Sequence, residues 1–324
     1  MKIGLDVMGG DFAPKATLEG AILAQRTLAK NDQIVLIGKQ ELIRDELVAM
    51  DANPEDFTIV NASEVIGMGD SPTKALIQKP DSSIAVGFRM MKSGEIDAFA
   101  SAGSSGAMLV GAIYSVNTIQ GIVRPTTTAI IPKVNGGFNI LLDVGTNPDV
   151  KPETLYQFAI LGAMYAEYVH NISNPKVGLL NIGEEEKKGS LLAQSTYQLM
   201  KNTEDFNFAG NIEGRDIFKD KADVIVCDGF TGNIVLKQAE AMYRILVKRG
   251  IQDEYLDRFN YENYGGTPVL GVDGTVIVGH GISNDKAIKN MILLSKEVHE
   301  AGLAKKIKEA LVRHALSNKS ADDI

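Results

Sequence analysis

The residues best suited to chemistry lie in an expected strand, loop and helix over residues 176–192, KVGLLNIGEEEKKGSLL. An apolar run ends at Asn181 and Gly183, the charged loop after it carries Lys188, and Ser190 is placed to cap the next helix. A loop from a buried strand to a helix lies at the carboxyl edge of an α/β sheet, where such folds bind ligands. An amide and a cation at that edge suit an anionic ligand, and a solvated charged turn is the alternative.

A second candidate anion site is the run SAGSSG. The strand expected over residues 97–100 delivers small residues into a helix that starts near Ala107, and these are Ser101, Gly103, Ser104, Ser105 and Gly106. Backbone N–H groups and the positive dipole end at a helix start attract phosphate or a developing oxyanion. A structural serine cap is the competing interpretation.

Other expected strand ends also carry polar side chains. In chain order they are Asp143, Thr146, Asn147, Asp228, Thr231, Asn233 and His280. Of the chain's 4 histidines, His280 alone is expected at a strand tip. Cys227 closes an apolar run with no histidine close to it in the sequence, so we predict a buried structural thiol rather than a nucleophile.

Alternating apolar strands and amphipathic helices must position these residues. Strands over 126–132 and 139–143 are expected to form a pair, the first antiparallel at an edge, and the helix after Cys227 is expected to begin near Ile234. Residues 62–83 are expected to be a loop that ends in a serine cap. A glycine turn is expected before the final strand at 275–278.

The composition is that of a soluble globular protein that uses many tight turns. Its 324 residues include 32 glycines and 10 prolines, and a net charge of -8 argues against nucleic-acid binding. One cysteine fits a reducing cytosol, and neither a signal peptide nor a membrane span is expected. Walker A, G-x-G-x-x-G, G-x-S-x-G and metal-binding motifs are all missing from the sequence.

Apolar residues recur at helical spacing late in the chain: Ile251, Tyr255, Leu256 and Phe259. Such a stripe usually packs against the core or a second subunit, and an acyl-chain or membrane contact is the sharper alternative.

Nine motifs run through nearly the whole chain in a specific order and spacing. They are DVMGGDFAP (6–14), EVIGMGDSPTKA (64–75), SAGSSGAM (101–108), GIVRP (121–125), LLDVGTN (141–147), VGLLNIGEEEKKG (177–189), GNIEGRDI (210–217), VCDGFTGNIVLK (226–237) and YGGTPVLG (264–271). With these motifs the chain resembles the bacterial phosphate acyltransferases of the PlsX family.

The resemblance implies a homodimeric, Rossmann-like three-layer α/β/α sandwich with a mostly parallel sheet, similar to phosphotransacetylases and isopropylmalate dehydrogenases. It implies one domain over residues 1–324, or two closely joined lobes, and residues 317–324 are expected to fray. The implied reaction forms acyl phosphate from inorganic phosphate and long-chain acyl-acyl carrier protein, for phosphatidic acid and phospholipid synthesis. It needs no organic cofactor and takes place in the cytoplasm, with peripheral contact at the inner face of the membrane and a membrane acyltransferase as a further candidate partner.

The resemblance also suggests residue roles. Amides from Gly103 to Gly106 would cradle phosphate with Lys188 as the cationic partner. Asn181, Asn233 or His280 would donate to the oxyanion or protonate the departing thiolate. The catalytic candidates are thus Lys188, Asn233, His280 and Asp228. The substrate-binding candidates are Ser101, Gly103, Ser104, Ser105, Gly106, Asn147, Asn181, Gly183 and Thr231.

Two other functions stay open at this point. One is a phosphotransacetylase-like enzyme that uses acyl-CoA, and the other is a non-catalytic phosphate-binding scaffold for phospholipid enzymes. A basic surface for an acidic carrier protein is expected at Arg244, Lys248, Arg249 and Arg258.

Overall fold

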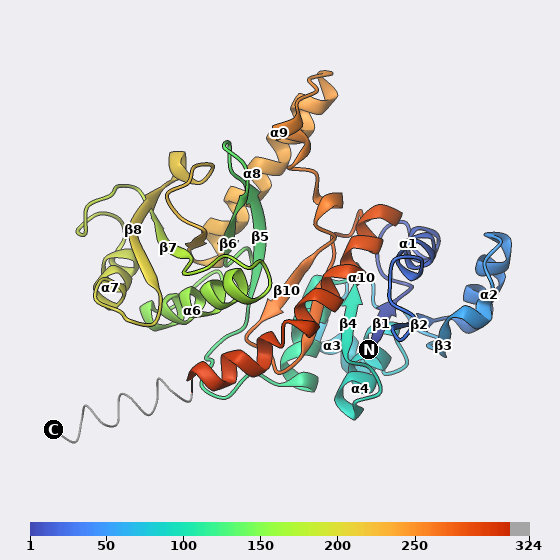
Figure 1. Cartoon of the computed structure of the whole chain (residues 1–324). Coiled ribbons are helices and arrows are strands. Elements are labelled where there is room, and N and C mark those ends of the chain that lie inside the picture. The colour runs from blue at the N-terminus through green and yellow to red at the C-terminus, as the bar shows by residue number, and fades with distance from the viewer. Residues whose placement is uncertain (312–324) are drawn as a thin grey trace. The chain divides into compact units, whose positions relative to one another are not determined.

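The computed structural model describes residues 1–311 and divides them into two compact units (Figure 1). Unit 1 comprises residues 1–118 and 261–300, and unit 2 comprises residues 119–260 and 301–311. The tail expected at 317–324 lies outside the described residues. Within residues 1–311, no helix combines the length and apolarity needed to cross a membrane.

Unit 1 is built on a sheet with the strand order β3-β2-β1-β4-β11-β10. Its strands are β1 (Lys2–Asp6), β2 (Gln33–Gly38), β3 (Thr58–Asn61), β4 (Ala98–Ser101), β10 (Thr267–Leu270) and β11 (Thr275–Val278). All neighbours from β3 to β11 are parallel, and β10 runs antiparallel to β11. The carboxyl ends of β1, β4 and β11 therefore meet at one edge.

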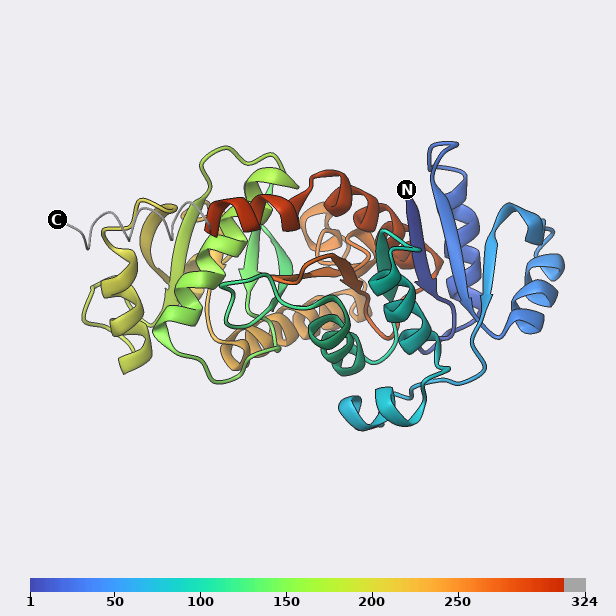
Figure 2. The same cartoon turned by 90° about the horizontal axis from the view of Figure 1, so that it is seen from below.

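Helices cover the unit 1 sheet. They are α1 (Lys15–Gln25), α2 (Gln40–Ala49), α3 (Pro72–Gln78), α4 (Ser83–Ser93), α5 (Ser105–Gly111) and α10 (Asp285–Glu300). Helices α1 and α10 pack side by side, as both views show (Figures 1 and 2). The Phe88 ring of α4 meets the Phe99 ring of β4 edge-on, with centroids 5.1 Å apart, in the apolar core of the unit.

Unit 2 has the strand order β5-β6-β9-β7-β8, and only the β5–β6 pair is antiparallel. The strands are β5 (Thr126–Pro132), β6 (Phe138–Leu142), β7 (Lys176–Asn181), β8 (Asn207–Glu213) and β9 (Val224–Val226). Its helices are α6 (Pro152–Tyr168), α7 (Leu191–Met200), α8 (Gly229–Lys248) and α9 (Glu254–Asp257), and a short 3₁₀ turn, η3, spans Gly214–Asp216.

Side-chain alternation along the strands gives unit 2 its layers. Leu142 of β6 lies against Gly162 of α6, whereas the preceding Leu141 joins a cluster that includes Val235 of α8. Helices α6 and α8 thus cover opposite faces of the sheet (Figure 2). The predicted mostly parallel, layered α/β fold is confirmed.

Three local expectations were wrong. Residues 72–78 form α3 rather than loop, with Pro72 at the first helical position. The segment before the final strand contains β10. Helix α8 starts at Gly229 rather than near Ile234, because Asp228 caps it.

Candidate functional site

A cavity of about 570 Å³ opens where β7 and β9 of unit 2 end and α7 and α8 begin. Its lining includes three of the predicted site residues, Asn181, Asp228 and Thr231. It also contains Ser190 and the buried thiol of Cys227. The structure thus brings together side chains from segments about fifty residues apart in the sequence, as expected for the carboxyl edge of a parallel sheet.

Asn181 closes the charged loop after β7. Its Oδ1 accepts a hydrogen bond from the Ile182 N–H at 2.8 Å, and its Nδ2 donates to the Lys188 carbonyl at 3.1 Å. Gly189 makes this closure possible, because it has φ +86° and a Cβ there would lie 2.0 Å from Asn181 Oδ1. The loop that holds Lys188 is therefore fixed at both ends.

Lys188 has a weakly held cation. Its Nζ lies 3.8 Å from Glu185 Oε1, and the lysine side chain is 51% exposed. An exposed pair at that distance contributes little stability, so exchanging the carboxylate for another anion would cost little. Gly183 packs against the Lys188 side chain, and a Cβ at this glycine would come within 2.9 Å of Lys188 Cγ.

The two helix starts at this cavity differ in charge. Ser190 caps α7 as predicted, its Oγ accepting from the Ala193 N–H at 3.2 Å. Asp228 caps α8 with a carboxylate, which accepts from the Thr231 N–H and the Thr231 hydroxyl, both at 2.8 Å. A carboxylate already compensates the positive end of α8, whereas the neutral cap of α7 leaves its dipole available to an anion.

Asn233 lies in the second turn of α8 because the helix starts early. A Cβ at Gly145, in the loop after β6, would lie 3.5 Å from Asn233 Oδ1, so the amide packs beside that loop. Gly232 brings the helix close to the strand end, since a Cβ there would fall 1.9 Å from the Asp143 carbonyl oxygen.

Asn147 is committed to the framework. Its backbone N–H and Nδ2 both donate to Asp143 Oδ2, at 2.6 and 2.7 Å, and Nδ2 also donates to the Pro125 carbonyl at 2.8 Å. Both residues are buried, and burial raises the pKa of the Asp143 carboxyl. The Asn147 amide thus fixes the course of the loop after β6.

Unit 1 holds the other predicted set, at the ends of β1 and β4. Ser101 Oγ donates to Asp6 Oδ2 at 2.6 Å and accepts from the Gly103 N–H at 2.9 Å. Ser104 caps α5 by accepting from the Ala107 N–H at 3.3 Å, so the structural cap is present here. Ser105 is exposed at the first turn of the helix.

Gly106 and His280 complete the unit 1 set. A Cβ at Gly106 would lie 2.6 Å from Pro72 Cγ, so α5 packs closely on α3. His280 follows β11 as predicted, and its Nδ1 accepts from the Ile282 N–H at 3.3 Å. Its ring is 5.3 Å from that of Tyr261, centroid to centroid, and tilted against it.

Asp6 and Gly189 were not predicted as functional residues, although Asp6 organises the end of β1 and Gly189 allows the loop after β7 to close. Asp6 is buried, and burial raises the pKa of its carboxyl, although Ser101 and backbone amides donate to it. The available signal was an aspartate at the end of a buried strand. The thiol prediction is confirmed, because Cys227 is buried and burial raises its pKa. Within residues 1–311, no group of three or more acidic, histidine or cysteine side chains is arranged to hold a metal ion.

Two relatives of this chain are phosphate acyltransferases. Residues 1–306 match a family model described as "Fatty acid synthesis protein". A phosphate acyltransferase of Syntrophomonas wolfei is 42% identical over 310 residues, which cover 94% of this chain and 96% of that protein. A phosphate acyltransferase of Dictyoglomus thermophilum is 43% identical over 330 residues, which cover 96% of this chain and 98% of the other.

Solved structures give the same fold at lower identity. The EutD phosphotransacetylase of Staphylococcus aureus superposes with a TM-score of 0.62 at 15% identity, over 92% of this chain and 94% of the other. A phosphotransacetylase of Streptococcus pyogenes has a TM-score of 0.62 at 18% identity, with the same coverage of both chains. At these identities the likeness shows a shared Rossmann-like α/β fold and nothing about substrate.

Proposed function

This chain belongs to the phosphate acyltransferase family, and we propose that it transfers the acyl group of a long-chain acyl-acyl carrier protein to inorganic phosphate. The observation that carries the proposal is identity of 42% over 94% of the chain to a phosphate acyltransferase. The weakly held cation and the neutral helix start at the unit 2 edge support it, because both suit a phosphate. The acyl phosphate product would serve phosphatidic acid and phospholipid synthesis.

The reaction requires the protein to position phosphate beside the thioester, and it does not require a protein nucleophile. A phosphate oxygen attacks the thioester carbonyl carbon, a C–O bond forms, and the carbonyl oxygen becomes an oxyanion. Collapse of this intermediate breaks the C–S bond, and the sulfur leaves with the electron pair and takes up a proton. A buried thiol with a raised pKa, such as Cys227, is not required at any step. Binding and oxyanion stabilisation are the contributions expected of the protein.

Within unit 2 the roles divide between two elements. Lys188 and the start of α7 would hold phosphate, because the loop closed by Asn181 fixes them next to each other in the chain. Asn233 is the better donor to the oxyanion, since the Asn181 amide already bonds within its own loop. Asp228 would act as the cap that sets the direction of α8 rather than as an acid or base.

Within unit 1, His280 stays a predicted proton donor, as the family resemblance implies. Backbone amides near Ser105 and Gly106 remain candidate phosphate donors, whereas the Gly103 N–H already donates to Ser101 Oγ.

The carrier protein would dock on a smaller basic surface than the sequence predicted. Arg258 donates to the Lys133 carbonyl at 3.0 Å and to the Gly137 carbonyl, so it braces the β5–β6 hairpin. Arg244 lies 3.8 Å from Glu240 on the same helix. Lys248 and Arg249, exposed at the end of α8, remain the proposed contacts for an acidic partner. Homodimer formation, a cytoplasmic location with peripheral membrane contact, and a membrane acyltransferase that accepts the product are further parts of this proposal.

The test is acyl phosphate formation by the purified chain, trapped as hydroxamate with hydroxylamine. We expect phosphate-dependent product from palmitoyl-acyl carrier protein and much less from palmitoyl-CoA. Equal or faster turnover of the CoA donor would favour a phosphotransacetylase-like enzyme. No product from either donor would favour a phosphate-binding scaffold.

A matched pair of variants tests the phosphate role of Lys188. We expect Lys188→Ala to raise the KM for phosphate by about tenfold, because a charge-assisted hydrogen bond contributes about 1.5–3 kcal/mol. Lys187→Ala removes the neighbouring exposed lysine from the same loop and serves as the control, with an unchanged KM for phosphate. Equal KM values for both variants would remove Lys188 from the phosphate site.

A further inference from the structure

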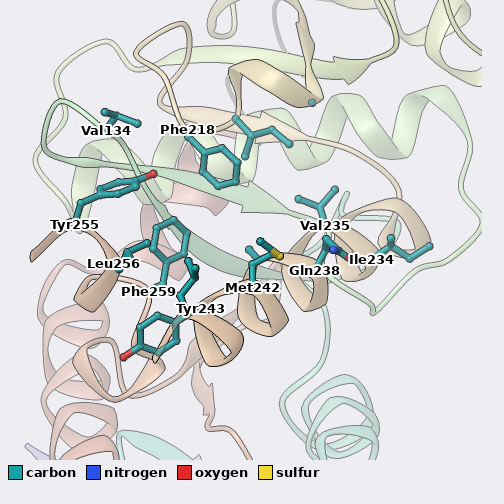
Figure 3. A pocket seen from close by; sticks show the side chains of 14 residues that line it. Val134, Phe218, Ile234, Val235, Gln238, Met242, Tyr243, Tyr255, Leu256 and Phe259 are labelled. Carbon is teal, nitrogen blue, oxygen red and sulfur yellow. The ribbon is translucent and has the colours of Figure 1, made fainter. Parts of the chain in front are cut away.

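A second cavity of unit 2, of about 630 Å³, is enclosed mainly by apolar side chains. Its wall comes from one side of α8, from α9 and the residues after it, and from the segment that follows η3. Figure 3 shows Phe218, Phe259 and Met242 around this common space. Its volume is within the range of about 300–1,000 Å³ that proteins use for small ligands.

The outer wall is held in place by specific contacts. The Tyr255 hydroxyl donates to the Pro132 carbonyl at 3.2 Å, and Arg258 donates to the Lys133 carbonyl at 3.0 Å, which fastens α9 to the β5–β6 hairpin. The Phe259 ring packs against the rings of Tyr255 and Phe218, with centroids 5.3 and 5.9 Å away. The cavity is thus a built feature of the unit, and its wall is continuous from α9 to Phe218.

The apolar cavity adjoins the strand-end cavity, the space of about 570 Å³ at the ends of β7 and β9. Gly214, Ile217 and Val235 line both, so the two spaces share a wall. On one side of that wall lie Asp228 and Thr231 and the strand ends, and on the other lie Met242 and the aromatic rings. A ligand with a polar reactive group and an apolar tail has the same division of chemistry along its length.

We propose that this apolar cavity binds the fatty acyl chain of the donor while the thioester carbonyl lies in the strand-end cavity, near Asp228 and Thr231; this inference rests on the proposed function. Ile234 and Met242 of α8 support it, because they leave 51% and 48% of their surface exposed beside the cavity. Large exposed apolar side chains that lie together mark a protein contact, a membrane contact or a ligand groove, and the wall shared with the strand-end cavity favours a ligand here. Each methylene group that enters would raise affinity by about fourfold until the cavity is full.

Two alanines of α8 provide a matched test. Ala239 lines the cavity, whereas Ala241, exposed on the same helix, is not among its lining residues. Ala239→Trp would fill part of the space, and Ala241→Trp adds the same side chain outside it. Both variants are assayed with butyryl- and palmitoyl-acyl carrier protein, so that the carrier contacts are the same for both chain lengths.

We expect Ala239→Trp to raise the KM for the palmitoyl donor by at least about tenfold, the effect of displacing roughly two methylene groups. The butyryl KM should change less than twofold, and Ala241→Trp should leave both values unchanged. Equal effects on both donors, or no effect, would overturn the proposal. So would a loss of dimer mass in light scattering without chain-length selectivity, because a second copy of the chain would then be the occupant.

A replacement variant and a direct binding measurement cover the cases in which the first test fails. If Ala239→Trp fails to fold, Gln238→Trp replaces it, since Gln238 is exposed and lines the apolar cavity but not the strand-end cavity. If the wild-type chain forms no acyl phosphate, the proposed function fails, and direct binding of palmitate decides the cavity separately. Palmitate binding that Ala239→Trp abolishes and Ala241→Trp keeps would support the acyl site, and absence of binding would overturn it.

Discussion

Replacing Asp228 by asparagine or alanine separates a helix cap from a catalytic carboxylate. The carboxylate makes two hydrogen bonds of 2.8 Å, both to Thr231, at the start of the 20-residue helix α8. Asparagine and aspartate cap helices about equally well, whereas alanine costs about 0.5–2 kcal/mol. Loss of the negative charge at the helix start costs about 0.3–1 kcal/mol more.

We therefore expect Asp228→Ala to lower the free energy of unfolding by about 1–3 kcal/mol. Asp228→Asn should lower it by less than about 1 kcal/mol, because only the charge contribution is lost. Urea unfolding followed by circular dichroism measures both values, and the hydroxamate assay measures kcat for both variants.

The kinetic result decides the role. A capping role predicts that Asp228→Asn keeps kcat within about threefold of the wild type, since the direction of α8 and the position of Asn233 are preserved. General acid or base catalysis would instead lose about 10²–10⁴-fold in kcat without loss of stability. That second pattern would refute the capping argument and return Asp228 to the catalytic residues.

Two further predictions test the loop and the acid stability of unit 2. Gly189→Ala places a Cβ 2.0 Å from Asn181 Oδ1, so we expect the KM for phosphate to rise while most of the fold survives; an unchanged KM would contradict the loop argument. The Asp216 carboxyl accepts hydrogen bonds from Lys221 and Lys219, which lower its pKa to about 2. Because the folded pKa lies below the unfolded one, its contribution to stability is complete above pH ~4 and declines as pH falls toward about 2. Lys221→Met should reduce that decline in acid unfolding curves, and an identical curve would exclude this pair as its cause.

Local signals in the sequence predicted the strands at 126–132, 139–143 and 275–278 and several helix starts. Ser82 and Ser190 cap their helices as expected, because a serine before an apolar periodic run is a local feature. The antiparallel pairing of β5 with β6 was also predictable, since a short glycine-containing connection joins two strand-like runs.

The error at the start of α8 arose because glycine serves packing there rather than chain flexibility. The start of α8, GFTGN, has the composition of a loop, so the helix was expected several residues later. Position 232 of the helix requires glycine, because a larger residue would strike the Asp143 carbonyl. This requirement comes from the end of β6, about ninety residues earlier. No local pattern contains that information.

The strand-end cavity was partly predictable from the sequence, and the apolar cavity was not. Strand ends can be counted from the sequence, and the topology of parallel sheets brings them to one edge. The wall of the apolar cavity combines Val134, Phe218 and Phe259, which come from three distant segments and meet only in the folded unit. The stripe around Phe259 was correctly expected to pack on apolar residues, but its partner could not be named.

Two buried carboxylates at strand ends, those of Asp6 and Asp143, lower the stability of the fold at neutral pH but fix the loops around them. Asp6 in unit 1 and Asp143 in unit 2 each accept hydrogen bonds from the loops around them. Burial raises the pKa of both, so ionisation near neutral pH costs more in the folded chain than in the unfolded one. These aspartates therefore oppose folding as pH rises through their folded pKa values, and stability alone does not explain their positions. What they provide is the fixed course of two loops, the one that begins with Ser101 in unit 1 and the one that ends with Asn147 in unit 2.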